Sequence, residues 1–208
     1  MSGVLRFLPV ILVAAGAAAA GAWFAARVSA PEAPEHARIL ERPRAVPAVP
    51  MTGADGEALD PSLFRDHWTL VFFGFTNCPD VCPMTLQTLA GASERLGDLP
   101  EARQPEVVMI SLDPRRDEPE QLGRYVAFFD ESFRGISVAA EDLPELTRAF
   151  GAAFAYVPAG EDSYTVDHTA SVFLVDPQAR LAAVFTTPHT AEGIARDYRR
   201  VLAAREAG

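Results

Sequence analysis

The feature that most constrains the fold is a continuous apolar run, Trp68 to Phe75, that leads directly into two cysteines. The run is short and rich in aromatic and branched side chains, which is typical of a strand buried on both faces. It is followed by the segment Cys78-Pro-Asp-Val-Cys82-Pro. Pro83 lacks an N–H group and has a helix-compatible φ angle, so it suits the first helical position. The sequence therefore predicts a buried strand, a loop with Cys78, and a helix entered at Cys82.

Short apolar runs alternate with amphipathic stretches along the rest of the chain. We expect further strands at 107–112, 171–175 and 181–185, and helices at 84–96, 118–129, 143–150 and 192–202. Strands separated by helices favour parallel pairing, and the last two strands form a hairpin that adds an antiparallel edge. This order is typical of an α/β, thioredoxin-like fold, in which a central mixed sheet is flanked by helices.

The N-terminal segment has no charged residue from Phe7 to Ala26. About 20 apolar residues are needed to cross a bilayer as a helix, so we expect a single transmembrane anchor at 7–26 after a short cytoplasmic stretch at 1–6. A cleaved signal peptide is the alternative, because Val28-Ser29-Ala30 offers a weak cleavage-like exit. Either interpretation exports the remainder of the chain.

Residues 27–50 hold five prolines among charged residues. This composition predicts a stiff, extended linker instead of a packed element. Residues 51–208 are then left to form one thioredoxin-like domain, which is an ordinary length for a single core.

Charge and cysteine content exclude two classes of protein. The formal net charge is −10, and an acidic surface repels phosphate backbones, so we expect no nucleic-acid partner. The chain has two cysteines, four positions apart. A small secreted domain held together by disulfides carries more cysteines and spreads them out.

The position of the cysteine pair predicts reactive sulfurs. A helix N-terminus favours thiolate, so we expect lowered thiol pKa values at Cys78 and Cys82. Helical geometry separates their Cα atoms by about 6 Å, which lies within the range that a disulfide accepts and also leaves room for an ion. A purely stabilising disulfide is a third use, but so small a loop gains little from closure.

His168 is the expected third ligand among four histidines. It lies just before strand 171–175, and the start of that strand faces the cysteine loop in a thioredoxin-like fold. Ordinary thioredoxins have a cis-proline there, whereas this chain has no proline between 159 and 176. We expect the other three histidines to be surface or structural residues: His36, His67 and His189.

Two sulfurs and one imidazole favour copper as the ion. Thiolates select Cu(I), and imidazole suits Cu(I) and Cu(II) alike. Structural zinc sites normally have four protein ligands, and a fourth cannot be assembled from this chain without strain. Nearby, Asp167 either orients the His168 ring or caps a turn, Asp80 tunes the site or belongs to the turn, and Met84 packs into the core. Asp113 and Asp176 precede prolines and are interpreted as turn residues.

Three motifs together resemble the SCO/SenC family. They are Phe72-Phe-Gly-Phe-Thr-Asn-Cys-Pro-Asp-Val-Cys-Pro, Ser111-Leu-Asp-Pro-Arg-Arg-Asp, and Val166-Asp-His-Thr-Ala-Ser with Leu174-Val-Asp-Pro. The likeness runs from about Trp68 to the C-terminus. It departs from the family at residues 46–56, where two prolines and no aromatic residue predict a short or poorly formed opening hairpin.

The resemblance implies a function and a location. Copper would be bound by Cys78, Cys82 and His168, and delivered to the binuclear copper (CuA) centre of cytochrome c oxidase subunit II. Other periplasmic copper carriers are implied partners. The implied location is the bacterial inner membrane, crossed once, with the C-terminal domain in the periplasm.

We therefore expect a carrier and not an enzyme, with one main alternative. The same thiols suit a thiol–disulfide oxidoreductase that reduces the acceptor's cysteines. A peroxiredoxin-like peroxidase is disfavoured, because Phe75 stands three residues before Cys78 where a threonine is expected.

Overall fold

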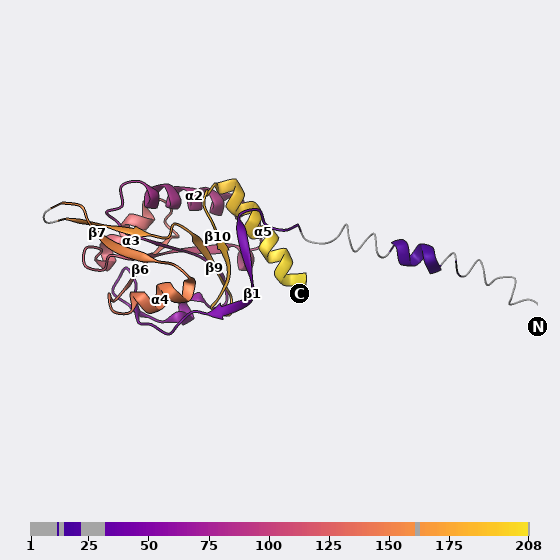
Figure 1. Cartoon of the computed structure of the whole chain (residues 1–208), viewed down its shortest axis with the longest axis horizontal. Helices are drawn as coiled ribbons and strands as arrows, with labels where there is room; N and C mark the ends of the chain where they lie inside the picture. The colour runs from indigo at the N-terminus through magenta and orange to yellow at the C-terminus, as the bar shows by residue number, and fades with distance from the viewer. Residues whose placement is uncertain (1–11, 13–14, 22–31, 161–162, 208) are drawn as a thin grey trace, which may run out of the picture.

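The computed structural model describes residues 12, 15–21, 32–160 and 163–207 (Figure 1). The strands are β1 (Ala37–Ala45), β2 (Met51–Thr52), β3 (Ala58–Leu59), β4 (Trp68–Gly74), β5 (Pro105–Ser111), β6 (Arg134–Val138), β7 (Phe154–Pro158), β8 (Tyr164–His168), β9 (Val172–Asp176) and β10 (Arg180–Phe185). The longer helices are α2 (Val81–Leu96), α3 (Pro119–Ala127), α4 (Leu143–Phe150) and α5 (Ala191–Ala207). Short 3-10 turns cover η1 (Pro61–Phe64) and η2 (Glu101–Arg103).

A mixed sheet forms the centre of the domain, as the sequence predicts. Its strand order is β1-β10-β9-β4-β5-β6-β2-β3. β4 and β5 are parallel, as are β5 and β6, whereas β9 is antiparallel to both β4 and β10. Figure 1 shows α2 and α5 side by side on one face of the sheet and α4 on the opposite face. β4 is therefore covered on both sides, which explains its uninterrupted apolar sequence.

The aromatic side chains of β4 fill the core on its two faces. Phe73 packs edge to face against Phe150 of α4, with ring centroids 5.3 Å apart, and against Phe173 of β9 at 5.7 Å. Its neighbour Phe72 points to the other face, as alternation along a strand requires, and contacts the ring of His168. One strand thus supplies both the core and the wall of the site.

The prediction of a linker over residues 27–50 is wrong for its second half. Residues 37–45 form β1, which pairs antiparallel with β10, so the predicted C-terminal hairpin does not lie at the sheet edge. The ladder is irregular between Ile39 and Arg44, and Pro43 lies within that interval. Proline lacks the N–H of a ladder and is tolerated on edge strands and at bulges, so the prolines do not prevent a strand here.

The opening hairpin is short, as predicted. β2 and β3 have two residues each, and Met51 of β2 is buried beside Val138 of β6. The structure also has three strands that the sequence analysis did not predict, namely β6, β7 and β8. β7 and β8 pair only with each other, as a separate two-stranded sheet.

Most of the predicted anchor, residues 7–26, lies outside the described residues, as does the candidate cleavage site at 28–30. Residues 15–21 are helical. Within the part of the chain that the structure describes, no helix combines the length and the apolar character needed to span a bilayer.

Candidate metal centre

The cysteines lie where the central strand gives way to a helix. β4 ends at Gly74, the loop that follows carries Cys78, and α2 begins at Val81. Pro83 is therefore the third residue of the helix and not the first. Its missing N–H costs nothing there, because the first four N–H groups of a helix have no partner within it. Cys82 in the first turn is fully buried, and Cys78 is half-buried.

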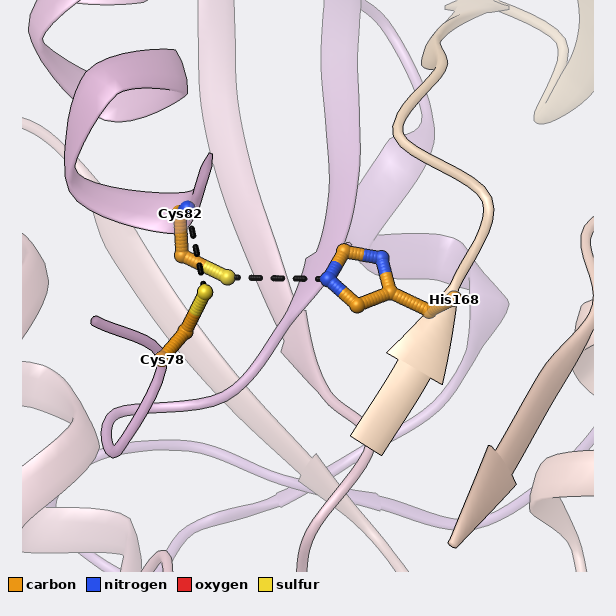
Figure 2. A group of neighbouring side chains, drawn as sticks. All are labelled: Cys78, Cys82 and His168. Atoms are coloured by element: carbon orange, nitrogen blue, oxygen red, sulfur yellow. Dashed lines mark hydrogen bonds between the residues drawn. The ribbon is translucent and has the colours of Figure 1, made fainter. Parts of the chain in front are cut away.

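The three predicted ligands come together in the folded chain (Figure 2). The backbone N–H of Cys82 donates to Cys78 Sγ at 3.3 Å, and Cys82 Sγ lies 3.6 Å from His168 Nε2. All three ligand atoms are within 4.8 Å of one another. Both cysteines are free thiols. Among the described residues, no other set of three His, Cys, Asp or Glu side chains gathers in this way.

His168 is oriented by its own backbone neighbour and by aromatic rings. It ends β8, and its Nδ1 lies 3.1 Å from the carbonyl oxygen of Thr169. An Nδ1–H donated to that carbonyl leaves the lone pair of Nε2 facing Cys82. The rings of Phe72 and Phe75 pack edge-on against the imidazole, with centroids 5.9 and 6.0 Å away. These contacts thus hold the ring in an orientation in which Nε2 can bind a metal ion.

Asp167 does not orient the imidazole. Its side chain is exposed, and the contact at Nδ1 is made by Thr169. Asp80 occupies the N-cap position of α2 but makes no capping hydrogen bond with its side chain.

Burial shifts the pKa values of Cys82 and His168 in opposite directions. Desolvation, followed by the hydrogen bond with Cys78, raises the pKa of the Cys82 thiol. This contradicts the expectation of a lowered pKa: the field of the helix N-terminus is outweighed because the sulfur has no access to water. Burial lowers the pKa of His168, against smaller opposing effects of the Thr169 carbonyl and Asp167. A neutral imidazole is the form that binds metals.

The site opens on one side into a groove of about 430 Å³. The groove is lined by Cys78 and His168 and by apolar side chains that include Pro79, Val81 and Val157. Met84 was expected in the core, but its side chain is 68% exposed. It follows the buried Cys82 by two residues, and two helical steps turn a side chain to the other side of the helix. The half-buried Cys78 is thus open to solvent through a groove that is mostly apolar but is also lined by Asp80 and Asp167.

The other histidines lie elsewhere. His67 pairs with Glu106, with Nε2 3.3 Å from a carboxylate oxygen, beside the start of β4. His189 Nε2 lies 2.8 Å from the carbonyl oxygen of Ala170, and burial lowers its pKa. The backbone oxygen of His36 accepts from Thr186 next to β1. None of them has a ligand atom in the cluster.

Asp113 and Asp117 are buried near the site and have hydrogen-bond partners that the sequence analysis missed. Asp176, by contrast, is the turn residue predicted, and it accepts from the backbone N–H groups of Gln178 and Arg180. Asp113 also begins a turn as predicted, because its backbone oxygen accepts from the N–H groups of Arg116 and Asp117. Its carboxylate in addition accepts from the side chains of Arg116 and Tyr164, and the Asp117 carboxylate accepts from Thr76 and Ser111. The motif Ser111-Leu-Asp-Pro-Arg-Arg-Asp was the available signal, but its partners lie far away in sequence.

Comparison with known proteins finds similarity over most of the chain. Residues 41–203 match the family described as SCO1/SenC. The mitochondrial protein SCO2 homolog of Bos taurus is 30% identical over 208 residues, which cover 96% of this chain and 77% of the bovine one.

Solved structures agree with this similarity. ScoI of Bradyrhizobium japonicum with copper bound has a TM-score of 0.66 and 30% identity, and the comparison covers 76% of this chain and 99% of the other. The solution structure of apo Sco1 from Thermus thermophilus has a TM-score of 0.65 and 35% identity, covering 83% and 95% of the two chains.

Proposed function

The chain belongs to the SCO1/SenC family, and we propose that it is a copper metallochaperone. It holds one copper ion between Cys78, Cys82 and His168 and delivers the ion to the binuclear copper centre of cytochrome c oxidase subunit II. The observation that carries this proposal is the gathering of two free thiols and a neutral imidazole within 4.8 Å.

The donor set supports copper as the cargo. Two soft sulfurs and one imidazole suit Cu(I), and the same set accepts Cu(II). Related ScoI of Bradyrhizobium japonicum is known with copper bound. Three ligands leave the metal open to a further donor, which is useful for a protein that must release its cargo.

Transfer begins at Cys78 in this proposal. Cys78 is half-buried and lines the groove, whereas Cys82 is enclosed. A thiolate of the acceptor enters through the groove, binds the metal and displaces Cys78 first. Cys82 and His168 leave afterwards, as the acceptor completes its own ligand shell.

Copper titration of the purified full-length chain tests the binding step. We expect one Cu(I) per chain and loss of tight binding in Cys78→Ser and Cys82→Ser. His168→Ala should weaken Cu(I) binding by more than the roughly 10–100-fold that loss of an outer-shell partner costs, as measured by competition with a chromophoric Cu(I) chelator. Unchanged affinity in His168→Ala would refute the three-ligand site.

Thiol–disulfide exchange is the second candidate, because both cysteines are free thiols and the backbone N–H of Cys82 donates to Cys78 Sγ at 3.3 Å, which brings the two residues together. A thiolate of the pair would attack a disulfide of the acceptor, forming a mixed disulfide. The second cysteine would then resolve it, leaving Cys78–Cys82 oxidised and the acceptor reduced. His168→Ala separates the candidates: delivery of copper should fail in this variant, whereas exchange with a disulfide substrate should persist.

The proposal includes a place in the cell. The uncharged run at 7–26 supports a single membrane anchor, with the domain in the periplasm of a bacterium, where other copper carriers would load it.

A further inference from the structure

The loop between β5 and α3 connects the two halves of the metal site without supplying a ligand. We name residues 111–117 the bracket segment. It contains two fully buried carboxylates, Asp113 and Asp117, and the buried hydroxyl of Ser111. Carboxylates are rarely enclosed unless every oxygen is bound, so their hydrogen-bond partners indicate what the segment holds.

Asp117 holds the cysteine loop. Its carboxylate accepts from the backbone N–H of Thr76 at 3.0 Å and from the Thr76 hydroxyl at 2.6 Å. Thr76 stands two residues before Cys78. A pair of hydrogen bonds to one residue fixes both the position of the loop and its direction.

Asp113 and Arg116 hold the strand that carries His168. The Tyr164 hydroxyl donates to Asp113 at 2.7 Å, and Arg116 donates to the Tyr164 carbonyl oxygen at 3.0 Å. The Arg116 guanidinium carbon also lies 3.8 Å from the centroid of the Tyr164 ring, a cation–π distance. Tyr164 begins β8, and His168 ends it.

The β7–β8 hairpin (strands Phe154–Pro158 and Tyr164–His168) is not part of the main sheet, so these contacts and the packing of Val166 into the core attach it to the domain. Apart from the contacts of His168 itself, its hydrogen bonds to the rest of the described chain all end on the bracket segment. The remaining bond runs from the Tyr156 hydroxyl to the Leu112 carbonyl oxygen at 2.9 Å. Figure 1 shows the hairpin extending from the body of the molecule.

Ser111 joins the two halves. Its hydroxyl donates to Asp117 at 2.6 Å and accepts from the backbone N–H of Asp113 at 3.0 Å. We propose that the bracket segment sets the separation between the imidazole and the sulfurs, with Tyr164 and Thr76 as the positioning residues that transmit it to His168 and to Cys78. This inference rests on the proposed copper site and assigns its geometry to residues outside it.

Tyr164→Phe tests the histidine half in the full-length chain, because it removes only the hydroxyl that Asp113 accepts. We expect Cu(I) affinity to fall about tenfold, within the range known for outer-shell partners. The visible absorption and paramagnetic resonance spectra of the Cu(II) form should shift toward those of His168→Ala. Tyr198→Phe is the matched control. It removes a tyrosine hydroxyl that likewise donates one hydrogen bond, to the Arg103 carbonyl oxygen at 2.7 Å on another part of the fold, and should leave both readouts unchanged.

A double variant distinguishes positioning from general loss of stability. In a His168→Ala background, Tyr164→Phe should cause no further loss of Cu(I) affinity, because the imidazole that Tyr164 positions is already absent. Thr76→Val removes a hydroxyl bonded to Asp117, and should lower affinity in both backgrounds, because it acts on the cysteine loop.

The outcomes separate the two proposals. If the unmodified chain binds no Cu(I), the proposed function and the bracket fall together. If it binds Cu(I) and His168→Ala weakens binding, but Tyr164→Phe matches Tyr198→Phe, the bracket alone is refuted. Equal loss from Tyr164→Phe in both backgrounds also refutes it, since the effect would not pass through His168.

Discussion

At the scale of single residues, burial decides which protons the ligand side chains hold. The same loss of water raises the pKa of the Cys82 thiol and lowers that of the His168 imidazole, because burial disfavours the charged form of each. Near neutral pH the free site therefore presents a protonated Cys82 and an unprotonated His168. A metal ion must displace a proton from the sulfur but none from the ring.

Copper binding should therefore become tighter as pH rises. Each proton released on binding raises apparent affinity about tenfold per pH unit, so long as pH stays below the pKa of the group that loses it. The raised pKa of Cys82 keeps this dependence through the neutral and mildly alkaline range. Chelator competition at a series of pH values checks it.

Cys82→Ser provides the comparison for this pH series. Whatever affinity it retains should depend on pH with a slope about one unit smaller, because the proton of Cys82 no longer takes part. His168→Ala should keep the slope of the unmodified chain above the ordinary histidine pKa of 6.5. Identical slopes for Cys82→Ser and the unmodified chain would show that Cys82 is already a thiolate in the free protein.

The three ligands were predictable, but their chemical state was not. A cysteine pair at the carboxyl end of a buried strand and a histidine before a later strand are both visible in the sequence, and the family resemblance joins them. The acidity of Cys82 and the partner of the His168 ring depend on what covers them. The burial of Cys82 and the Thr169 carbonyl oxygen beside the His168 ring arise only in the folded chain.

At the scale of elements, Asp197 of α5 fastens the start of β1. Its carboxylate is fully buried and accepts from three successive backbone N–H groups, those of Glu35, His36 and Ala37. Asp197→Ala should lower the free energy of unfolding by about 2–4 kcal/mol, since hydrogen bonds to charged groups are worth about 1.5–3 kcal/mol each and their losses overlap. Denaturant unfolding measures this change.

The same contact predicts how acid affects stability. The three backbone hydrogen bonds hold the pKa of Asp197 below its ordinary value despite the opposing effect of burial. A carboxyl with a depressed folded-state pKa stabilises above its unfolded pKa of 3.8 and loses that contribution as pH falls through the folded value. Between pH 5 and strong acid, Asp197→Ala should thus lose less stability than the unmodified chain. A parallel loss in both proteins would contradict this assignment.

The elements that the sequence predicted are those in which burial alone sets the pattern of apolar residues. β4, β5, β9 and β10 are apolar because they lie inside a covered sheet, and the helices show one apolar face. β6 escaped prediction because it is short and contains Gly135, where a Cβ would lie 2.7 Å from Leu122 Cγ of α3. Close helix packing requires that glycine, although glycine in a strand weakens the sequence signal.

At the scale of the whole molecule, the metal site joins two separately built parts. The main sheet and α2 supply the sulfurs, and the projecting β7–β8 hairpin supplies the imidazole. The main sheet and α2 could be predicted from local sequence patterns. The attachment of the hairpin could not, because it consists of side-chain contacts between segments about 50 residues apart, such as Tyr164 with Asp113.

The position of β1 also sets the true boundary of the domain. A fragment beginning at residue 51, the boundary suggested by the prolines, would lack β1 and expose one edge of β10. An open strand edge promotes association with other chains, and Asp197 would keep a buried carboxylate without its three donors. A fragment of residues 32–208 retains both features.

We expect the thermal unfolding midpoint of fragment 51–208 to lie at least about 10 °C below that of fragment 32–208, since each kcal/mol of stability shifts the midpoint by about 2–4 °C at this size. We also expect fragment 51–208 to form oligomers, which size-exclusion chromatography detects. Equal unfolding midpoints and two monomeric fragments would mean that β1 contributes nothing to the stability of the domain and that the prolines mark its boundary after all.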